Sequence, residues 1–149
     1  MSSDPEVPIK YTRVGTGIIV VNNKGEILMG RRKGSFAPYF SLPGGHLEPG
    51  ETFEDNAVRE AKEETNLDIS NPKVIGVTNN LETYRLEGKP YVSIVMCTDT
   101  FTGELRNREP EKCESWEWYD PRQLPEPCFD ASRRGIDCYL QGTFYKKYE

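Results

Sequence analysis

The chain has 149 residues, of which 36% are hydrophobic and 29% charged, and its formal net charge is −5. This length suits one domain covering residues 1–149, and the acidic balance disfavours a protein that coats nucleic acid, because such a protein needs a basic surface. No apolar run approaches the roughly 20 residues that cross a bilayer, and the N-terminus lacks the pattern of a secretory signal, so we expect a cytoplasmic protein that binds neither nucleic acid nor membrane.

The first predicted elements are two strands joined by a turn. Segment 11–32, YTRVGTGIIVVNNKGEILMGRR, has a β-branched apolar run at 18–21 and turn residues at 22–25 before a second apolar stretch. This pattern predicts a β-hairpin. The following segment 33–45, KGSFAPYFSLPGG, is rich in Gly, Pro and Ser, and it predicts a loop around a short extended piece at 40–42.

A helix is predicted from about Thr52 to Thr65. Thr52 is a suitable N-cap, and Glu54 and Asp55 fall in the first turn, where the helix dipole favours acidic side chains. Asn66 suits the left-handed position that ends a helix, because asparagine tolerates positive φ. The sequence therefore gives both ends of this helix.

Beyond this helix, two strand-like runs follow, KVIGVTNNLETYR at 73–85 and PYVSIVMCTDTF at 90–101, joined by a turn that contains Gly88. SWEWYD at 115–120 predicts a short strand, and DASRRGIDCYLQG at 130–142 predicts a last short helix. The order β-β-β-α-β-β-β-α indicates an α/β protein in which helices pack on a mixed sheet.

The cysteines and the histidine exclude some kinds of site. The four cysteines have no C-x-x-C spacing, so we expect free thiols, as is usual in the cytosol. His46 is the one histidine, which excludes a multi-histidine zinc site. Its position in a glycine loop also weakens the case for a Ser-His-Asp triad.

The predicted helix is unusual in where its carboxylates point. At about 100° per residue, Glu60 and Glu64 project on the same side as Phe53, Ala57 and Ala61. Carboxylates at the edge of a core are costly, and two placed one turn apart repel each other. A bound divalent cation removes both penalties, and ligation by oxygen alone favours Mg²⁺ or Mn²⁺ over zinc. A solvated acidic face with no metal is the alternative.

The spacing of these residues resembles the Nudix box, G-x5-E-x7-R-E-U-x-E-E-x-G-U, in which U is a bulky aliphatic residue. The matching residues are Gly45, Glu51, Arg59, Glu60, Glu63, Glu64 and Leu67. Two positions depart from the pattern, since Ala61 replaces a larger aliphatic residue and Asn66 replaces a glycine. All acidic positions are retained, so we expect an active enzyme.

The resemblance implies an α/β/α sandwich around a mixed sheet, and a hydrolase that cleaves a nucleoside diphosphate linked to another moiety. By the same resemblance, Glu60 and Glu64 are the principal ligands of Mg²⁺, for which Mn²⁺ could substitute. Glu63 joins the ligand set or orients water, and the backbone of Gly45 approaches the metal. A nucleotide-sensing Nudix domain without catalysis is the alternative from another class.

The remaining catalytic assignments concern the base and the loop before the helix. Glu63 is the favoured general base, with Glu109 or Glu111 as the second candidate. The resemblance implies that Arg59 pairs with Glu51 and holds this loop against the helix.

Four residues are predicted to contact substrate. The backbone of Gly44 and Gly45 would approach the phosphates, where a side chain would obstruct. His46 follows the two glycines and is expected to face the same cleft, although a loop histidine bonded to backbone is the alternative. Strand alternation sends Arg31 and Arg32 to opposite faces, and we favour Arg31 for phosphate over a solvated strand end.

Further segments, GRRKGS, LPGGHLEPGE, YVSIVM and EPEKCESWEWYD, are similar to one branch of the family. It includes a human purine nucleoside triphosphate diphosphatase and plant cytosolic enzymes for dihydroneopterin triphosphate and oxidised nucleotides. This implies hydrolysis of a nucleoside triphosphate to the monophosphate and pyrophosphate, by enzymes that are commonly homodimers. Phe129 is retained without a neighbouring tryptophan, and Ser41 replaces a longer polar residue, so a dinucleotide, a nucleotide-sugar or dihydroneopterin triphosphate remains an alternative substrate.

Aromatic and small residues on two strands have open interpretations. Trp116 and Trp118 share one strand face, and core or dimer-interface packing is favoured over a platform for a base. Tyr91, Ser93 and Val95 share a face of another strand, where they could line a pocket or pack in the core.

Overall fold

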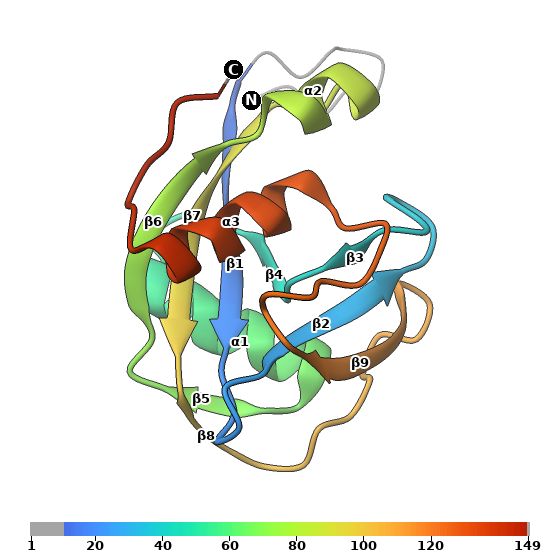
Figure 1. Cartoon of the computed structure of the whole chain (residues 1–149), viewed down its shortest axis with the longest axis vertical. Coiled ribbons are helices and arrows are strands. Elements are labelled where there is room, and N and C mark those ends of the chain that lie inside the picture. Colours follow the sequence, from blue (N-terminus) through green and yellow to red (C-terminus); the bar gives the residue numbers. More distant parts are fainter. Residues whose placement is uncertain (1–10, 149) are drawn as a thin grey trace.

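The computed structural model describes residues 11–148, which contain nine strands and three helices (Figure 1). In chain order these are β1 (Arg13–Val20), β2 (Ile27–Arg32), β3 (Phe40–Ser41), β4 (Gly44–His46), α1 (Phe53–Thr65), β5 (Asp68–Ser70), β6 (Lys73–Asn79), α2 (Leu81–Glu87), β7 (Tyr91–Thr98), β8 (Thr100–Thr102), β9 (Cys113–Tyr119) and α3 (Asp130–Gln141). In this part of the chain, every helix is too short or too polar to span a membrane.

The strands form three sheets. The largest has the order β4-β1-β7-β6, and it is mixed because β1 and β7 run parallel while the other pairs are antiparallel. A second sheet has the order β3-β2-β9, and β5 pairs with β8. Helices α1 and α3 lie on opposite faces of the four-stranded sheet (Figure 1). The predicted α/β/α sandwich around a mixed sheet is therefore confirmed.

Both faces of the four-stranded sheet are buried, which explains the uninterrupted apolar run in β1. Successive side chains of a strand point to opposite faces. One apolar cluster lies toward α1 and includes Ile18, Val20, Ala57, Ala61 and Met96. The other lies toward α3 and includes Ile19, Val95 and Ile136.

The predicted hairpin between β1 and β2 is wrong. The two strands meet only at the bridge between Val21 and Ile27, and beyond it they enter different sheets. The physical reason is that β1 is a central strand whose two edges are occupied by β4 and β7. The turn at 22–25 is present, with the backbone amide of Asn22 donating to the carbonyl of Glu26 at 2.9 Å.

The strand predicted over residues 73–85 ends early, because α2 occupies its second half. Asn80 is almost fully buried between the two elements, where it accepts from the hydroxyl of Thr78 at 2.8 Å and donates to Ser93 at 2.9 Å. Gly88 adopts φ 67° and ends α2, so the glycine caps a helix instead of turning a hairpin.

The two other helices begin and end close to where the sequence predicts. The Oγ1 atom of Thr52 accepts from the backbone amide of Asp55 at 3.0 Å, and Asn66 ends α1 with φ 67°. Helix α3 covers Asp130–Gln141, as predicted. The two caps of α1, Thr52 and Asn66, act through local geometry, which is why the sequence alone located them.

Trp116 is buried in the core and Trp118 packs half-buried against the same cluster, which agrees with the core packing favoured from the sequence. The indole nitrogen of Trp116 donates to the carbonyl oxygen of Glu64 at 3.1 Å, which ties β9 to the end of α1. Trp118 stacks on Phe101 with 5.6 Å between ring centroids. Neither residue belongs to the cavity described below.

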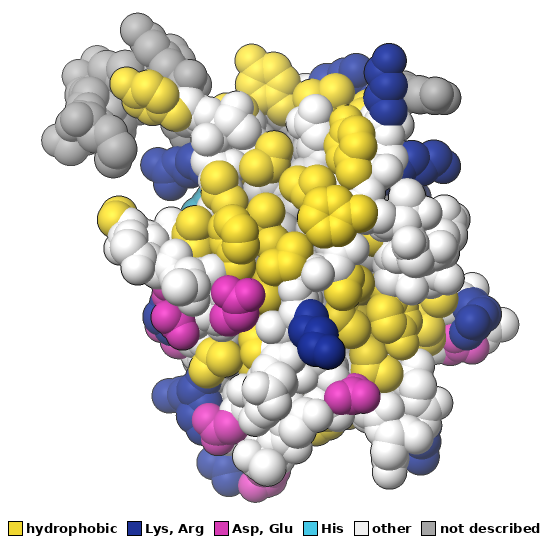
Figure 2. Space-filling model, turned by 90° about the vertical axis from the view of Figure 1, so that its left-hand side faces the viewer, with side chains coloured by type: hydrophobic (Ala, Val, Ile, Leu, Met, Phe, Trp, Pro, Cys, Tyr) yellow, Lys and Arg dark blue, Asp and Glu magenta, His cyan; other side chains and the backbone are white. Residues whose placement is uncertain are grey.

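The chain after α3 runs back along the edge strand β6 (Figure 1). The backbone amide of Val77 donates to the carbonyl of Phe144 at 2.9 Å. Hydrophobic side chains gather on this face of the molecule (Figure 2). The exposed large hydrophobic residues of α2 and of the segment after α3 are Tyr84, Leu86, Phe144 and Tyr145.

Candidate metal and diphosphate site

A cavity of about 690 Å³ opens on the face of the four-stranded sheet that α3 covers. Its inner wall is made of small and apolar residues of β1, β7 and α3, including Gly17, Ser93, Val95, Ser132 and Gly135. Acidic residues of α1 and of the segment before β9 also line it, namely Glu60, Glu63, Glu64 and Glu109. Cationic side chains complete the lining, namely Arg13, Arg32, Arg59, Lys89 and Lys112.

Glu64 is the most buried carboxylate of the site, with 7% of its surface exposed. Its Oε1 atom accepts from the backbone amide of Gly44 at 2.8 Å. Burial raises the pKa of this carboxyl group to about 8, and the charges of Glu60 and Glu109 add to the rise against the bond from Gly44. Such a carboxylate favours either a proton or a cation beside it.

The double glycine lies against these carboxylates. A β-carbon on Gly45 would lie 2.5 Å from Cδ of Glu60, and one on Gly44 would collide with the carbonyl oxygen of Thr16. Burial raises the pKa of Glu60, and Arg59 opposes this rise. The glycines therefore let the backbone of β4 approach the acidic helix closely.

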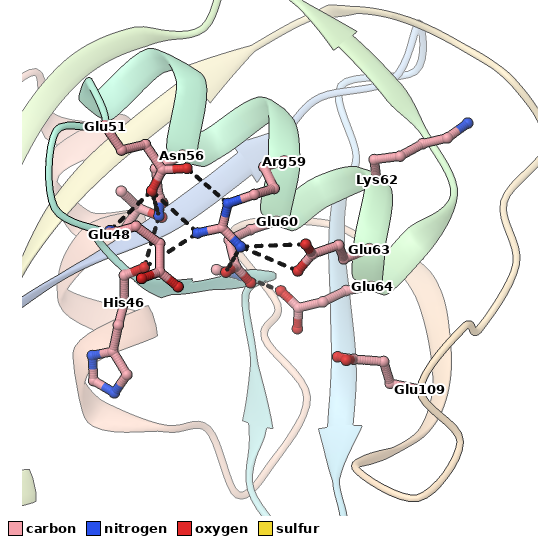
Figure 3. Close-up of polar contacts among 12 residues, drawn as sticks. His46, Glu48, Glu51, Asn56, Arg59, Glu60, Lys62, Glu63, Glu64 and Glu109 are labelled. Carbon is pink, nitrogen blue, oxygen red and sulfur yellow. Dashed lines mark hydrogen bonds and ion pairs between the residues drawn. The ribbon is translucent and has the colours of Figure 1, made fainter. Parts of the chain in front are cut away.

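Arg59 joins three carboxylates (Figure 3). It forms a two-point contact with Glu51, from Nε at 2.7 Å and from Nη2 at 3.1 Å. Its Nη1 atom donates to Glu60 at 2.9 Å and to Glu63 at 3.2 Å. The pair of Arg59 and Glu51 expected from the family resemblance is thus present, and it lowers the pKa of Glu51 to about 2.

Asn56 supports the site from behind, and no sequence pattern singled it out. It is fully buried, and its Oδ1 atom accepts from the hydroxyl of Thr16 at 2.5 Å. Its amide nitrogen donates to the carbonyl of His46 and to Glu51, both at 2.9 Å. Asn56 therefore ties the loop before α1 to both the helix and β1, at a position where the motif specifies no residue type.

The carboxylates suit a hard divalent ion through their donor type and the burial of Glu64. Among residues 11–148, no three acidic, histidine or cysteine side chains are already gathered around one point as metal ligands. Glu60 and Glu63 turn toward Arg59 instead, and 51% of the side chain of Glu63 is exposed. Glu60 and Glu64 could hold a metal together, with Glu63 joining them once it leaves Arg59.

Only some of the residues predicted to contact phosphate line the cavity. Arg31 does not line the cavity, and its Nε atom lies 3.6 Å from a carboxylate oxygen of Glu114. Arg32 lines the cavity instead. The register of β2 against β9 shifts between Gly30 and Arg32, so simple alternation could not identify which arginine faces the site.

Three residues of β7 and the glycine-rich segments also line the cavity. Tyr91, Ser93 and Val95 all face it, as their shared strand face allowed. His46 lines it as well, with its ring directed away from the glutamates of α1 (Figure 3). Burial lowers the pKa of His46, and the charges of Arg13 and Lys89 lower it further.

The two second-choice bases differ in position. Glu109 lines the cavity, whereas Glu111 does not.

Ser41 and Phe129 also contribute to the lining. The ring of Phe129 lies 4.8 Å from that of Phe36, which the sequence did not single out.

The chain matches known proteins over most of its length. Residues 11–139 match the family model of the NUDIX domain. The chain is 38% identical over 117 residues to the ADP-ribose pyrophosphatase of Methanocaldococcus jannaschii, a match that covers 78% of this chain and 66% of that enzyme. It is 30% identical over 142 residues to the RNA pyrophosphohydrolase of Serratia proteamaculans, covering 82% of this chain and 79% of that enzyme.

Solved structures show the same architecture. The MutT NUDIX hydrolase from Burkholderia pseudomallei aligns with a TM-score of 0.78 at 29% identity, over 86% of this chain and 98% of that one. The MutT protein from Methanosarcina mazei Go1 aligns with a TM-score of 0.73 at 21% identity, over 93% and 97% of the two chains, and it supports the fold alone.

A helix of carboxylates that packs against a double glycine, beside a cavity with cationic lining, defines a hydrolase of diphosphate linkages. The chain belongs to the Nudix family. It is a Nudix diphosphohydrolase, which cleaves pyrophosphate linkages in nucleotide-like substrates, and enzymes of this family generally use divalent metal ions.

Proposed function

We propose that this enzyme hydrolyses a nucleoside triphosphate to the monophosphate and pyrophosphate, with Mg²⁺ as its cofactor and Mn²⁺ as a possible substitute. The observation that carries the proposal is the position of Glu60 and Glu64 in a cavity that also contains cationic side chains. Buried carboxylates favour a cation, and unpaired cationic groups favour phosphate. The cavity therefore offers a place for a metal ion and a place for a polyphosphate.

The residues of the chain would divide the work as follows. Glu60 and Glu64 hold the metal, and the backbone of Gly44 and Gly45 leaves room for the phosphates. When bound, the metal neutralises charge on the diphosphate and lowers the pKa of a bound water. Arg32, on the same cavity, adds positive charge beside the phosphates.

The general base would be Glu63 or Glu109, both of which line the cavity. Glu63 must leave Arg59 before it can accept a proton, because Arg59 contacts both of its oxygens at 3.2 and 3.4 Å. The variants Glu63→Gln and Glu109→Gln separate the two. The variant that loses the base should lose kcat with little change in KM.

The decisive experiment is a substrate panel with product analysis, carried out with and without Mg²⁺. It should contain purine and oxidised nucleoside triphosphates, dihydroneopterin triphosphate, a dinucleotide polyphosphate and ADP-ribose. Release of pyrophosphate from a nucleoside triphosphate, only with the metal, supports the proposal. Binding of nucleotide without turnover, seen as a shift in melting temperature, would favour a nucleotide sensor.

ADP-ribose hydrolysis is the second candidate function. It is supported by the name of the Methanocaldococcus jannaschii relative, which shares 38% identity with this chain. In the same panel it predicts AMP and ribose phosphate as the main products, and a kcat/KM for ADP-ribose above that for any triphosphate.

Three further expectations belong with the proposal. We propose that residues 1–149 act as one domain, that the enzyme is cytoplasmic, and that it forms a homodimer without binding nucleic acid. The apolar side chains gathered near β6 (Figure 2) give the dimer a candidate surface. Light scattering after size-exclusion chromatography measures the mass directly, and a mass near 17.0 kDa would exclude the dimer.

A further inference from the structure

The outer end of the cavity carries two cationic side chains that the proposed chemistry does not use. Along β1, Gly17 pairs with Gly44 and Gly15 pairs with His46, so Arg13 lies beyond the glycines that contact the acidic helix. At about 3.3 Å per residue, the backbone of Arg13 lies roughly 13 Å from that of Gly17. Arg13 therefore belongs to a separate level of the cavity, further out than the metal carboxylates.

Lys89 is held close to Arg13. The backbone amide of Arg13 donates to the carbonyl of Pro90 at 3.1 Å, and Lys89 precedes that proline. Both side chains line the cavity. His46, which pairs with Gly15 two residues along β1 from Arg13, lines the same cavity. Glu48 is the acidic residue of the lining at this end, so positive charge is in excess there.

Phe36 connects this outer end to the carboxylate end. Its ring lies 4.7 Å from the ammonium nitrogen of Lys89 and 5.8 Å from the guanidinium carbon of Arg32. Arg32 and Glu64 both line the cavity. The cationic groups thus form a track that leads from the metal carboxylates, past the Phe36 ring, to Lys89 and Arg13.

A scattering of solvated surface cations would not be organised in this way. Phe36 has φ 65°, a conformation that a residue with a β-carbon adopts rarely and retains where surrounding contacts compensate. Here those contacts are the Phe129 ring and the two cations. Within residues 11–148, neither Arg13 nor Lys89 has a carboxylate at ion-pair distance, so both charges are available to a ligand.

The geometry points to a subsite, formed by Arg13 and Lys89, for the phosphoryl group that a triphosphate has and a simple diphosphate ester lacks. These side chains then determine specificity, because they favour triphosphates over substrates such as ADP-ribose. The inference rests on the proposed function of the same cavity, and it assigns the preference for a third phosphate to residues outside the Nudix box.

The test compares the double variant Arg13→Gln/Lys89→Gln with wild type and with Lys24→Gln. Lys24 is also an exposed cation, and it lies in the turn at residues 22–25, at the opposite end of β1 from Arg13. The readout is the ratio of kcat/KM for a nucleoside triphosphate to that for ADP-ribose. Hydrogen bonds to charged groups are stronger than those between neutral groups, and exposure to solvent weakens them. We therefore expect the ratio to fall about tenfold in the double variant and to stay at the wild-type value in Lys24→Gln.

A binding measurement makes the result independent of turnover. Calorimetry with Mg²⁺ should show inorganic tripolyphosphate binding more tightly than pyrophosphate to the wild type, and the double variant should lose this preference. An unchanged kcat/KM ratio, or a wild type that prefers ADP-ribose, would overturn the subsite while the hydrolase assignment stands. If no anhydride is cleaved at all, the proposed function fails, and equal binding of tripolyphosphate by both proteins then overturns the subsite as well.

Discussion

Replacing Glu64 by glutamine tests the electrostatics of the site, because it removes a charge and keeps the shape of the side chain. Burial raises the pKa of Glu64 from 4.5 to about 8. In the metal-free protein, the stability contributed by the protonated form is present below pH 4.5 and is lost as the pH rises toward 8. At ~1.4 kcal/mol per pKa unit, the loss above that pH is on the order of a few kcal/mol.

The assay is chemical denaturation in EDTA at about pH 5 and about pH 8.5. We expect Glu64→Gln to be more stable than wild type at the higher pH and similar to it at the lower pH, since the amide of Gly44 still finds an oxygen acceptor. With Mg²⁺ and nucleotide, only the wild type should gain stability, and turnover of the variant should fall by about 100-fold or more. A variant destabilised equally at both pH values, or one with near-normal turnover, would refute the reasoning.

Three other predictions follow from the same helix and loop. Gly45→Ala should displace the carboxylate of Glu60 and lower metal-dependent kcat by at least about tenfold. The measurement is kcat over a titration of Mg²⁺, and a curve for the variant that matches the wild type would contradict the steric argument. The pairing of Glu51 with Arg59 should contribute stability above pH 4.5 that is lost as the pH falls toward 2. In urea denaturation, Arg59→Met should reduce this loss of stability between pH 4.5 and pH 2. The same loss in the variant as in the wild type would speak against the pair. Asn56→Leu should lose about 2–3 kcal/mol of unfolding free energy, because its buried partners are left without hydrogen bonds, and a loss below about 0.5 kcal/mol would show that the network relaxes easily.

The sequence predicted best where structure is decided locally. Thr52 and Asn66 are recognisable as caps because each acts on its own helix end. Helical geometry likewise placed Glu64 near the core, and the structure buries it. The fold class followed from the order of the elements, since the order restricts how layers can pack.

The errors concern interactions between distant segments. The apolar run of β1 is compatible with a hairpin, and only its partners β4 and β7 show that it is a central strand. A register shift in β2 decides between Arg31 and Arg32, and no local pattern marks it. Lys89 and Arg13 were missed because their proximity depends on the parallel pairing of β1 with β7.

The way in which different elements contribute to the cavity has a consequence for how such an enzyme could change over evolutionary time. Most of the groups assigned to hydrolysis come from α1 and the short stretch that precedes it, with Arg32 of β2 and Glu109 before β9 in addition, whereas the rest of the cavity is contributed largely by β1, β7, α3 and the loop around Phe36. Mutations in those outer segments can therefore change which substrate the enzyme binds and leave the residues assigned to hydrolysis unchanged. Substrate selectivity can in this way evolve while the chemistry of hydrolysis is kept.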